Sequence, residues 1–237
     1  MRKALEIGGL VAAVVLIAFG IGAIVMGLNG RSTVNDSLKQ EQITGTPDMT
    51  PAAIKSEVAS AKAAQTALFA KLHAAGVKTE PSPIVTPSCS VAGTQVDNGS
   101  DARCFARYMR IHTFGATSGL TYSQMGRYVA KPGTPYKFTD GLGATSDPKW
   151  AATDPKTQQP VNNGRRDIWV TYTALTTALN TSYMASQLAL FGIVVGIALL
   201  LTGIGFGILA IGGALRAAET EARVAPKPAS PQTAVPA

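Results

Sequence analysis

The chain has 237 residues, a formal net charge of +7 and a hydrophobic fraction of 46%, and its longest apolar runs lie near its two ends. It has two cysteines and two histidines, and two cysteines are too few for a structural zinc site without help from histidine. The length between the apolar ends suffices for one domain with a core of its own.

The first apolar segment covers residues 7–28 and contains no charged side chain. About 20 such residues cross a bilayer as a helix, so the segment predicts a transmembrane helix behind a cytoplasmic stub of residues 1–6. A cleaved signal peptide is the alternative, because Arg2 and Lys3 precede the segment. The apolar run is longer than a signal h-region, and no A-x-A-like cleavage site follows it, which favours a retained anchor.

Residues 29–184 are expected to form a mostly helical domain outside the cytoplasm. The clearest helix signal covers residues 51–75, where apolar residues recur at helical spacing. Thr50 is a suitable N-cap, Pro51 fits the first helical position and Gly76 fits the C-terminal cap. The weaker elements of this domain are an outward extension of the first helix over 31–42, an extended proline-rich connector over 77–88, a helix that Ser100 or Asp101 caps and that ends at Gly115, a short helix over 121–128, and an irregular stretch over 131–164.

Cys89 and Cys104 both lie in this domain. An even pair of cysteines in a segment that faces an oxidising compartment predicts a disulfide, with two buried free thiols as the alternative. The chain-entropy account gives such a bridge a stabilising effect of about 3 kcal/mol.

The second apolar segment is expected to form a transmembrane helix over residues 185–215, continuous with a helix that opens at Asp167. A strand over 168–172 is the alternative there, because its residues have high β-propensity. Residues 216–237 are rich in proline and predict a disordered cytoplasmic tail. Lys and Arg flank both spans on their short sides, so both termini are expected in the cytoplasm, with the spans in the cell (plasma) membrane.

Four glycines of the second span lie at spacings of 4, 7 and 4 and therefore share one face of a helix. Such small residues let two membrane helices approach closely. The pattern leaves the partner open between the first span, a second copy of the chain and another subunit, and glycine is also simply common in membrane helices. The four residues are Gly192, Gly196, Gly203 and Gly207.

The chain has no nucleophile elbow, phosphate-binding loop or dinucleotide fingerprint, so no catalytic residue is assigned. His73 and His112 lie in separate predicted helices and lack a second ligand at helical spacing, which favours structural roles and predicts neither a metal nor another cofactor. Arg103, Arg107 and Arg110 recur at i, i+4 and i+7 and form a basic stripe. This stripe suits an anionic ligand or an acidic partner, with a solvated face paired to carboxylates as the alternative.

Five segments carry a likeness to a known group of proteins: Glu6 to Leu10, Arg31 to Ile43, Thr46 to Ile54, Ala102 to His112 and Ala178 to Ala185. They resemble a group of uncharacterised two-pass membrane proteins of actinobacteria. The likeness covers most of the chain outside residues 131–164 and implies the two-pass topology and an envelope location. Some members are labelled automatically as aromatic ring-opening dioxygenases, a label that the two separate histidines do not support.

These features predict a mainly α fold, in which a two-helix transmembrane hairpin carries a mostly helical, disulfide-pinned extracytoplasmic domain. The expected function is a non-enzymatic accessory or structural subunit of a cell-envelope membrane protein assembly. Its expected partners are the lipid bilayer and either other membrane subunits or further copies of the chain, but not nucleic acid. The alternative is an extracytoplasmic binding or sensing module for an anionic envelope ligand or an acidic partner. A third hypothesis is an enzyme whose cleft is assembled from residues distant in the sequence.

Overall fold

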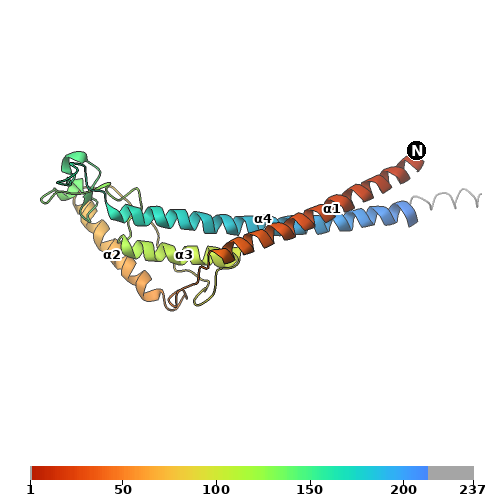
Figure 1. Ribbon diagram of the computed structural model, residues 1–237, viewed down its shortest axis with the longest axis horizontal. Coiled ribbons are helices and arrows are strands. Elements are labelled where there is room, and N and C mark those ends of the chain that lie inside the picture. Colours follow the sequence, from red (N-terminus) through yellow and green to blue (C-terminus); the bar gives the residue numbers. More distant parts are fainter. Residues whose placement is uncertain (1, 213–237) are drawn as a thin grey trace, which may run out of the picture. The chain divides into compact units, whose positions relative to one another are not determined.

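The computed structural model describes residues 2–212, and it is mainly helical, as predicted (Figure 1). The remainder of the second predicted span and the predicted tail, residues 213–237, lie outside the described residues. The elements are α1 (Arg2–Gln40), α2 (Lys55–Ala74), α3 (Gly99–Ala116), β1 (Tyr128–Val129), the 3-10 turn η1 (Tyr136–Phe138), β2 (Ala144–Thr145), the 3-10 turn η2 (Pro148–Trp150) and α4 (Gly164–Gly212).

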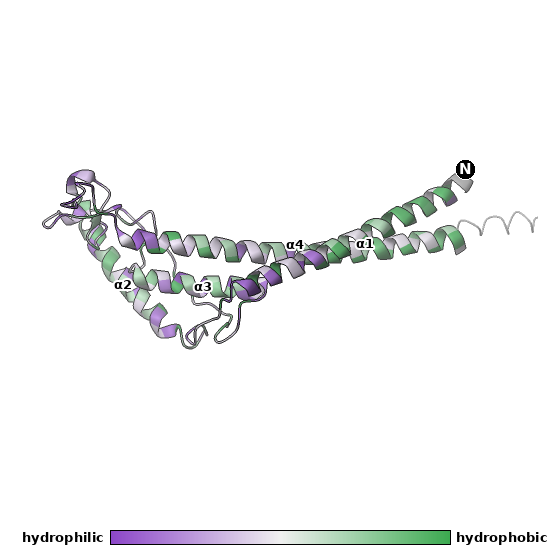
Figure 2. Cartoon of the chain, viewed as in Figure 1, coloured by the Kyte–Doolittle hydropathy of each residue, from purple (hydrophilic) through white to green (hydrophobic). Residues whose placement is uncertain are grey.

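The described residues divide into two compact units, and the two longest helices each contribute to both. Unit 1 comprises residues 2–30 and 188–212, and unit 2 comprises residues 31–187. α1 and α4 are each long and apolar enough to cross a membrane, which confirms the expectation of two such helices. Figure 2 shows the hydrophobic residues concentrated in the unit 1 segments of both helices.

Unit 1 is a pair of helical segments in antiparallel contact. A Cβ on Gly9 would lie 3.3 Å from the Cβ of Ala210, and one on Gly30 would lie 3.7 Å from the Cβ of Ala189. The contacts therefore run in opposite chain directions along the two helices. All fully buried described positions of this unit are glycine or alanine: Ala13, Gly20, Gly27, Gly196, Gly203 and Ala210.

Unit 2 has a core of larger side chains, to which all four helices contribute. Tyr108 and Phe114 of α3 are fully buried, and Trp169 of α4 meets the Phe114 ring edge-on at 5.7 Å between centroids. The indole N–H of Trp169 donates to the carbonyl of Leu120 at 2.8 Å. A buried Trp usually finds such a partner, because an unpaired N–H in a core is costly. The aromatic contact thus ties the start of α4 to the end of α3.

The helix boundaries follow the capping residues, with corrections to the sequence-based prediction. α2 begins at Lys55 rather than Pro51. Residues 51–54 form a turn, in which the Thr50 hydroxyl accepts the Ala53 N–H at 3.1 Å, as expected of a capping residue. The helix ends at Ala74, and Gly76, two residues later, has the positive φ of +79° expected of a glycine at a helix C-terminus. The N-cap of α3 is Asn98 and neither predicted residue, because the Asn98 side chain accepts the first free N–H groups of the helix.

The short helix predicted over residues 121–128 does not form, although half of its capping box does. The Gln124 carbonyl oxygen accepts the Thr121 N–H at 2.8 Å, and the Gln124 amide donates to the carbonyl of Glu80 at 2.6 Å. Gln124 therefore holds a turn against the proline-rich connector, and the chain then enters β1. The alternative strand over 168–172 is also absent, because α4 covers those residues without a break.

The irregular stretch over 131–164 is organised around one buried carboxylate. Asp140 is 6% exposed and accepts the backbone N–H groups of Gly126, Leu142 and Ala144 at 2.9–3.1 Å. Side-chain acceptors that satisfy several N–H groups replace the hydrogen bonds that a regular sheet would supply. The antiparallel pair β1–β2 is only two residues long on each strand.

The predicted disulfide between Cys89 and Cys104 is confirmed. It joins the proline-rich connector to α3, and the Tyr108 hydroxyl one turn later donates to the carbonyl of Cys89. Desolvation by burial raises the pKa of the Tyr108 phenol above its usual value of 10.0. The phenol therefore stays protonated and keeps donating across the neutral pH range.

Candidate functional site

The glycine stripe of α4 lies against α1 within unit 1. A Cβ on Gly196 would lie 2.7 Å from the carbonyl oxygen of Gly20, and one on Gly203 would lie 3.0 Å from that of Ala13. Gly192 and Gly207 are less tightly covered, with their nearest α1 atoms at 3.7 Å. Within the described residues, the glycine stripe therefore packs against the apolar segment of α1.

The opposite face of α1 carries small residues without neighbours inside the unit. Gly8 and Gly22 have no atom within 4 Å of an added Cβ, and Ala18 is exposed one turn before Gly22. Large apolar side chains surround them, and Phe19 and Met26 are 69% and 76% exposed. This face, defined by Gly8, Ala18 and Gly22, is called the outer face of α1 below.

The predicted basic stripe is divided by the structure into different environments. The Arg103 guanidinium lies over the Tyr183 ring at 4.5 Å, and that of Arg110 lies over the Phe114 ring at 4.9 Å. Arg110 also donates to the Ser82 hydroxyl at 3.2 Å. Arg107 is exposed and makes no hydrogen bond, ion pair or ring contact with the described residues. Within residues 2–212, none of the three forms an ion pair with a carboxylate.

Two of these arginines line a cavity of about 340 Å³ between α3 and the connector. We call it the connector pocket. It has two cationic groups from α3, two hydroxyl groups and an apolar wall, and no carboxylate is among the residues that line it. The lining residues are Pro83, Val85, Thr86, Pro87, Ser88, Arg107 and Arg110.

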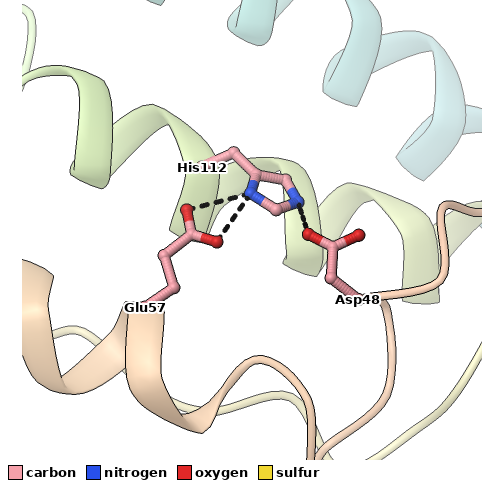
Figure 3. A group of neighbouring side chains, drawn as sticks. All are labelled: Asp48, Glu57 and His112. Atoms are coloured by element: carbon pink, nitrogen blue, oxygen red, sulfur yellow. Dashed lines mark hydrogen bonds and ion pairs between the residues drawn. The ribbon is translucent and has the colours of Figure 1, made fainter.

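A second polar cluster joins α3 to α2 and to the loop before α2 (Figure 3). Nδ1 of His112 on α3 lies 2.9 and 3.1 Å from the two carboxylate oxygens of Glu57 on α2. Its Nε2 lies 3.5 Å from Oδ2 of Asp48, which sits in the loop before α2. The imidazole thus lies between two carboxylates, one at each ring nitrogen. A doubly protonated ring donates to both.

Imidazole and carboxylate groups both bind metal ions. One such ligand atom from each of the three residues lies within 4.8 Å of the other two. Each ring nitrogen of His112 faces a carboxylate, and the three side chains form ion pairs when the ring is protonated.

Asp48 has a second anchor in this cluster. The hydrogen bond from the Thr46 hydroxyl has the largest influence on its carboxyl and lowers the pKa below the usual 3.8. Desolvation comes second and opposes this shift, while a backbone hydrogen bond and the charge of His112 add to it. The carboxylate is 44% exposed, so the interaction is a surface one. The contact between Asp48 and His112 connects the loop before α2 to α3.

His73, the other histidine, has a separate structural contact. Its Nε2 lies 2.6 Å from the carbonyl oxygen of Thr79, so the ring nitrogen there carries the proton. This bond holds the start of the connector to the end of α2. The His112 cluster was missed by sequence reasoning because its members come from three elements, and no local spacing signals that they meet.

A comparison of the chain with protein-family models, with curated proteins and with solved structures finds no match.

Proposed function

We propose that the chain is a non-enzymatic accessory or structural subunit of a cell-envelope membrane protein assembly, with unit 1 as a two-helix transmembrane hairpin. The observation that carries the proposal is the interior of unit 1, where every fully buried described residue is glycine or alanine. Charged residues inside a membrane domain usually mark ion or substrate routes. The spans contain none, which supports an anchor rather than a transport path.

Unit 1 satisfies its own glycine stripe and still exposes a small-residue patch on the outer face of α1. In lipid, where apolar surface alone does not drive association, such patches let helices pack closely. We propose that a membrane helix of another subunit or of a second copy packs there. The same face offers no polar group to recognise a soluble ligand.

We further propose that unit 2 lies outside the cytoplasm and that both termini lie inside. Disulfides persist in oxidising compartments, and Cys89 and Cys104 are bridged. Basic residues flank both spans on their short sides, which agrees with the positive-inside rule. A protease-cleavable tag inserted at Gln158, an exposed turn residue, tests this orientation. Cleavage in intact cells supports it, and cleavage only after lysis contradicts it.

The assembly itself is tested with variants of unit 1 that differ in which face they alter. Gly22→Leu enlarges the outer face of α1 without a clash inside the unit, because no atom lies within 4 Å of an added Cβ. We expect the wild-type protein to purify in mild detergent as a complex with another subunit or as an oligomer. The Gly22→Leu protein should purify without the partner subunit or as a monomer. Gly205→Leu on α4, which is equally uncrowded, serves as the matched control. A wild-type particle that is strictly monomeric and lacks a partner contradicts the proposal.

A further inference from the structure

The connector pocket presents cationic groups that no described carboxylate neutralises. Arg107 is exposed and unpaired within residues 2–212, and Arg110 is held by the Ser82 hydroxyl and the Phe114 ring. Guanidinium groups bind phosphate and carboxylate oxygens with paired hydrogen bonds. The pocket therefore offers one positioned guanidinium and one free guanidinium to the same anion.

The walls of the pocket are held in place before any ligand enters. The connector is fixed at Ser82, whose carbonyl accepts the Gln65 amide at 2.9 Å, and at Cys89, which is bridged to Cys104 on α3. Between these points Ile84 is 5% exposed and belongs to the core of unit 2. A pocket with fixed walls loses little conformational entropy on binding.

The remaining lining gives the pocket an apolar side. Val85 is 73% exposed, and it lies beside Pro83 and Pro87 in the lining. The hydroxyl groups of Thr86 and Ser88 make no hydrogen bond to other described residues. An inorganic anion would leave this apolar side unused, whereas an anion with an apolar substituent would cover it.

We propose that the connector pocket binds a phosphate ester that carries an apolar substituent. Arg107 and Arg110 bind the phosphate oxygens, the hydroxyls of Thr86 and Ser88 add hydrogen bonds, and the apolar substituent packs on Val85 and its neighbouring prolines. An anionic phospholipid and a free organic phosphate share this chemistry. The inference goes beyond the accessory role proposed above and does not depend on it.

The test is a calorimetric titration of the full-length protein in a nonionic detergent. The probes are dihexanoyl phosphatidylglycerol, its zwitterionic phosphatidylcholine counterpart, glycerol phosphate and inorganic phosphate. We expect phosphatidylglycerol to bind most tightly, because only this probe has both an unneutralised phosphate and acyl chains. Tightest binding of glycerol phosphate or inorganic phosphate assigns a free-anion site and overturns the part played by the apolar wall. Tightest binding of phosphatidylcholine, or no binding of any probe, overturns the proposal.

Variants of two arginines on one helix separate the pocket from general charge. Arg107→Gln should weaken the binding of phosphatidylglycerol about tenfold, the size expected for a lost charge-assisted hydrogen bond. Arg103→Gln removes the same charge one turn away, outside the lining, and should leave the affinity unchanged. Val85→Ser should weaken the binding of phosphatidylglycerol but leave the binding of glycerol phosphate unchanged. Equal losses in the Arg107 and Arg103 variants contradict the proposal.

Discussion

α4 buries different kinds of residue in its two parts, although it is one uninterrupted helix. In unit 2 its buried residues are Trp169, Thr176 and Leu179, whereas in unit 1 they are Gly196, Gly203 and Ala210. Burial of large apolar side chains stabilises a domain in water by about 25 cal/mol per Å². In lipid that gain is absent, and helices associate through close backbone approach. The change along α4 is what a passage from water to lipid requires, as we propose for this chain.

The surfaces of the two units differ in the same sense. Unit 1 exposes large apolar side chains such as Phe191 and Leu201, at 65% and 62%. Unit 2 covers its aromatic core and adds a disulfide and a buried carboxylate network around Asp140. We infer that close packing of small residues stabilises unit 1, whereas burial of large side chains stabilises unit 2. Substitutions in each unit test this difference.

The largest effect is expected at the glycine contacts of unit 1. Gly196→Leu would place its Cβ 2.7 Å from the Gly20 carbonyl oxygen, and backbone cannot yield there cheaply. Because the added atoms meet the backbone at two residues, Gly20 and Ile24, we expect a cost above the about 1–3 kcal/mol typical of overpacking, and the helix pair should separate. The readout is a bridge between cysteines introduced at Ala13 and Gly207, where an added Cβ would lie 3.7 Å from that of Ala13.

That bridge should form in the protein with the cysteine pair alone and be detected by mass spectrometry of the linked peptides. Gly205→Leu is the control, because an added Cβ there meets no atom within 4 Å. Efficient bridging in the Gly196→Leu protein would show that close glycine contacts do not hold unit 1 together.

The next largest effect is expected in unit 2 when its disulfide is removed. The double substitution Cys89→Ser and Cys104→Ser should lower the free energy of unfolding of this unit by about 3 kcal/mol, as the chain-entropy account gives for a loop of this length. Denaturant unfolding followed by circular dichroism measures the change. The engineered bridge in unit 1 should still form in this variant, and its loss would contradict the separation of the two units.

A smaller effect is expected at the aromatic contact between α3 and α4. Trp169→Phe removes the indole hydrogen bond to the Leu120 carbonyl and should cost about 1–2 kcal/mol. Trp150→Phe is the matched control, because Trp150 stacks on Phe138 outside this core and a Phe ring preserves the stacking. The chain has only these two tryptophans, so the fluorescence of each variant reports on the one that remains. Equal losses of stability in the two variants would argue against a central place for Trp169.

The smallest effect is expected at the surface ion pair of unit 2 and depends on pH. The lowered pKa of Asp48 stabilises the folded state above the ordinary value of 3.8, and this contribution is lost as the pH falls through the folded-state pKa. Asp48→Asn should therefore cost about 0.2–1 kcal/mol near pH 6 and progressively less in acid, since the carboxylate is partly exposed. Urea unfolding of both proteins between pH 2 and pH 6 measures this difference.

Thr46→Val sharpens that measurement, because it removes the donor that lowers the pKa most while Asp48 and His112 remain. In the Thr46→Val background, the difference in free energy of unfolding between the proteins with and without Asp48→Asn should therefore depend on pH much less than in the wild-type background. A difference between wild type and Asp48→Asn that persists unchanged at pH 2 would show that the carboxylate does not act through its charge.

Local signals sufficed for features that depend on a few adjacent residues. The helical signal over residues 51–75 anticipated α2, and Gly76 marked its end because only a residue tolerant of positive φ fits there. The same signals failed where tertiary contacts compete. The Gln124 side chain accepts the Thr121 N–H, as in a capping box. Its amide also donates to the Glu80 carbonyl in the connector, which stabilises a turn in place of the expected helix.

The sequence by itself determined the two long apolar helices and the pairing of Cys89 with Cys104, because composition and the count of cysteines leave few alternatives. Only the tertiary structure decided which helix the glycine stripe meets, and that Arg107 and Arg110 share a pocket from which Arg103 is absent. The same holds for His112, which meets two carboxylates from other elements. These outcomes depend on contacts between residues far apart in the chain, which local spacing does not specify.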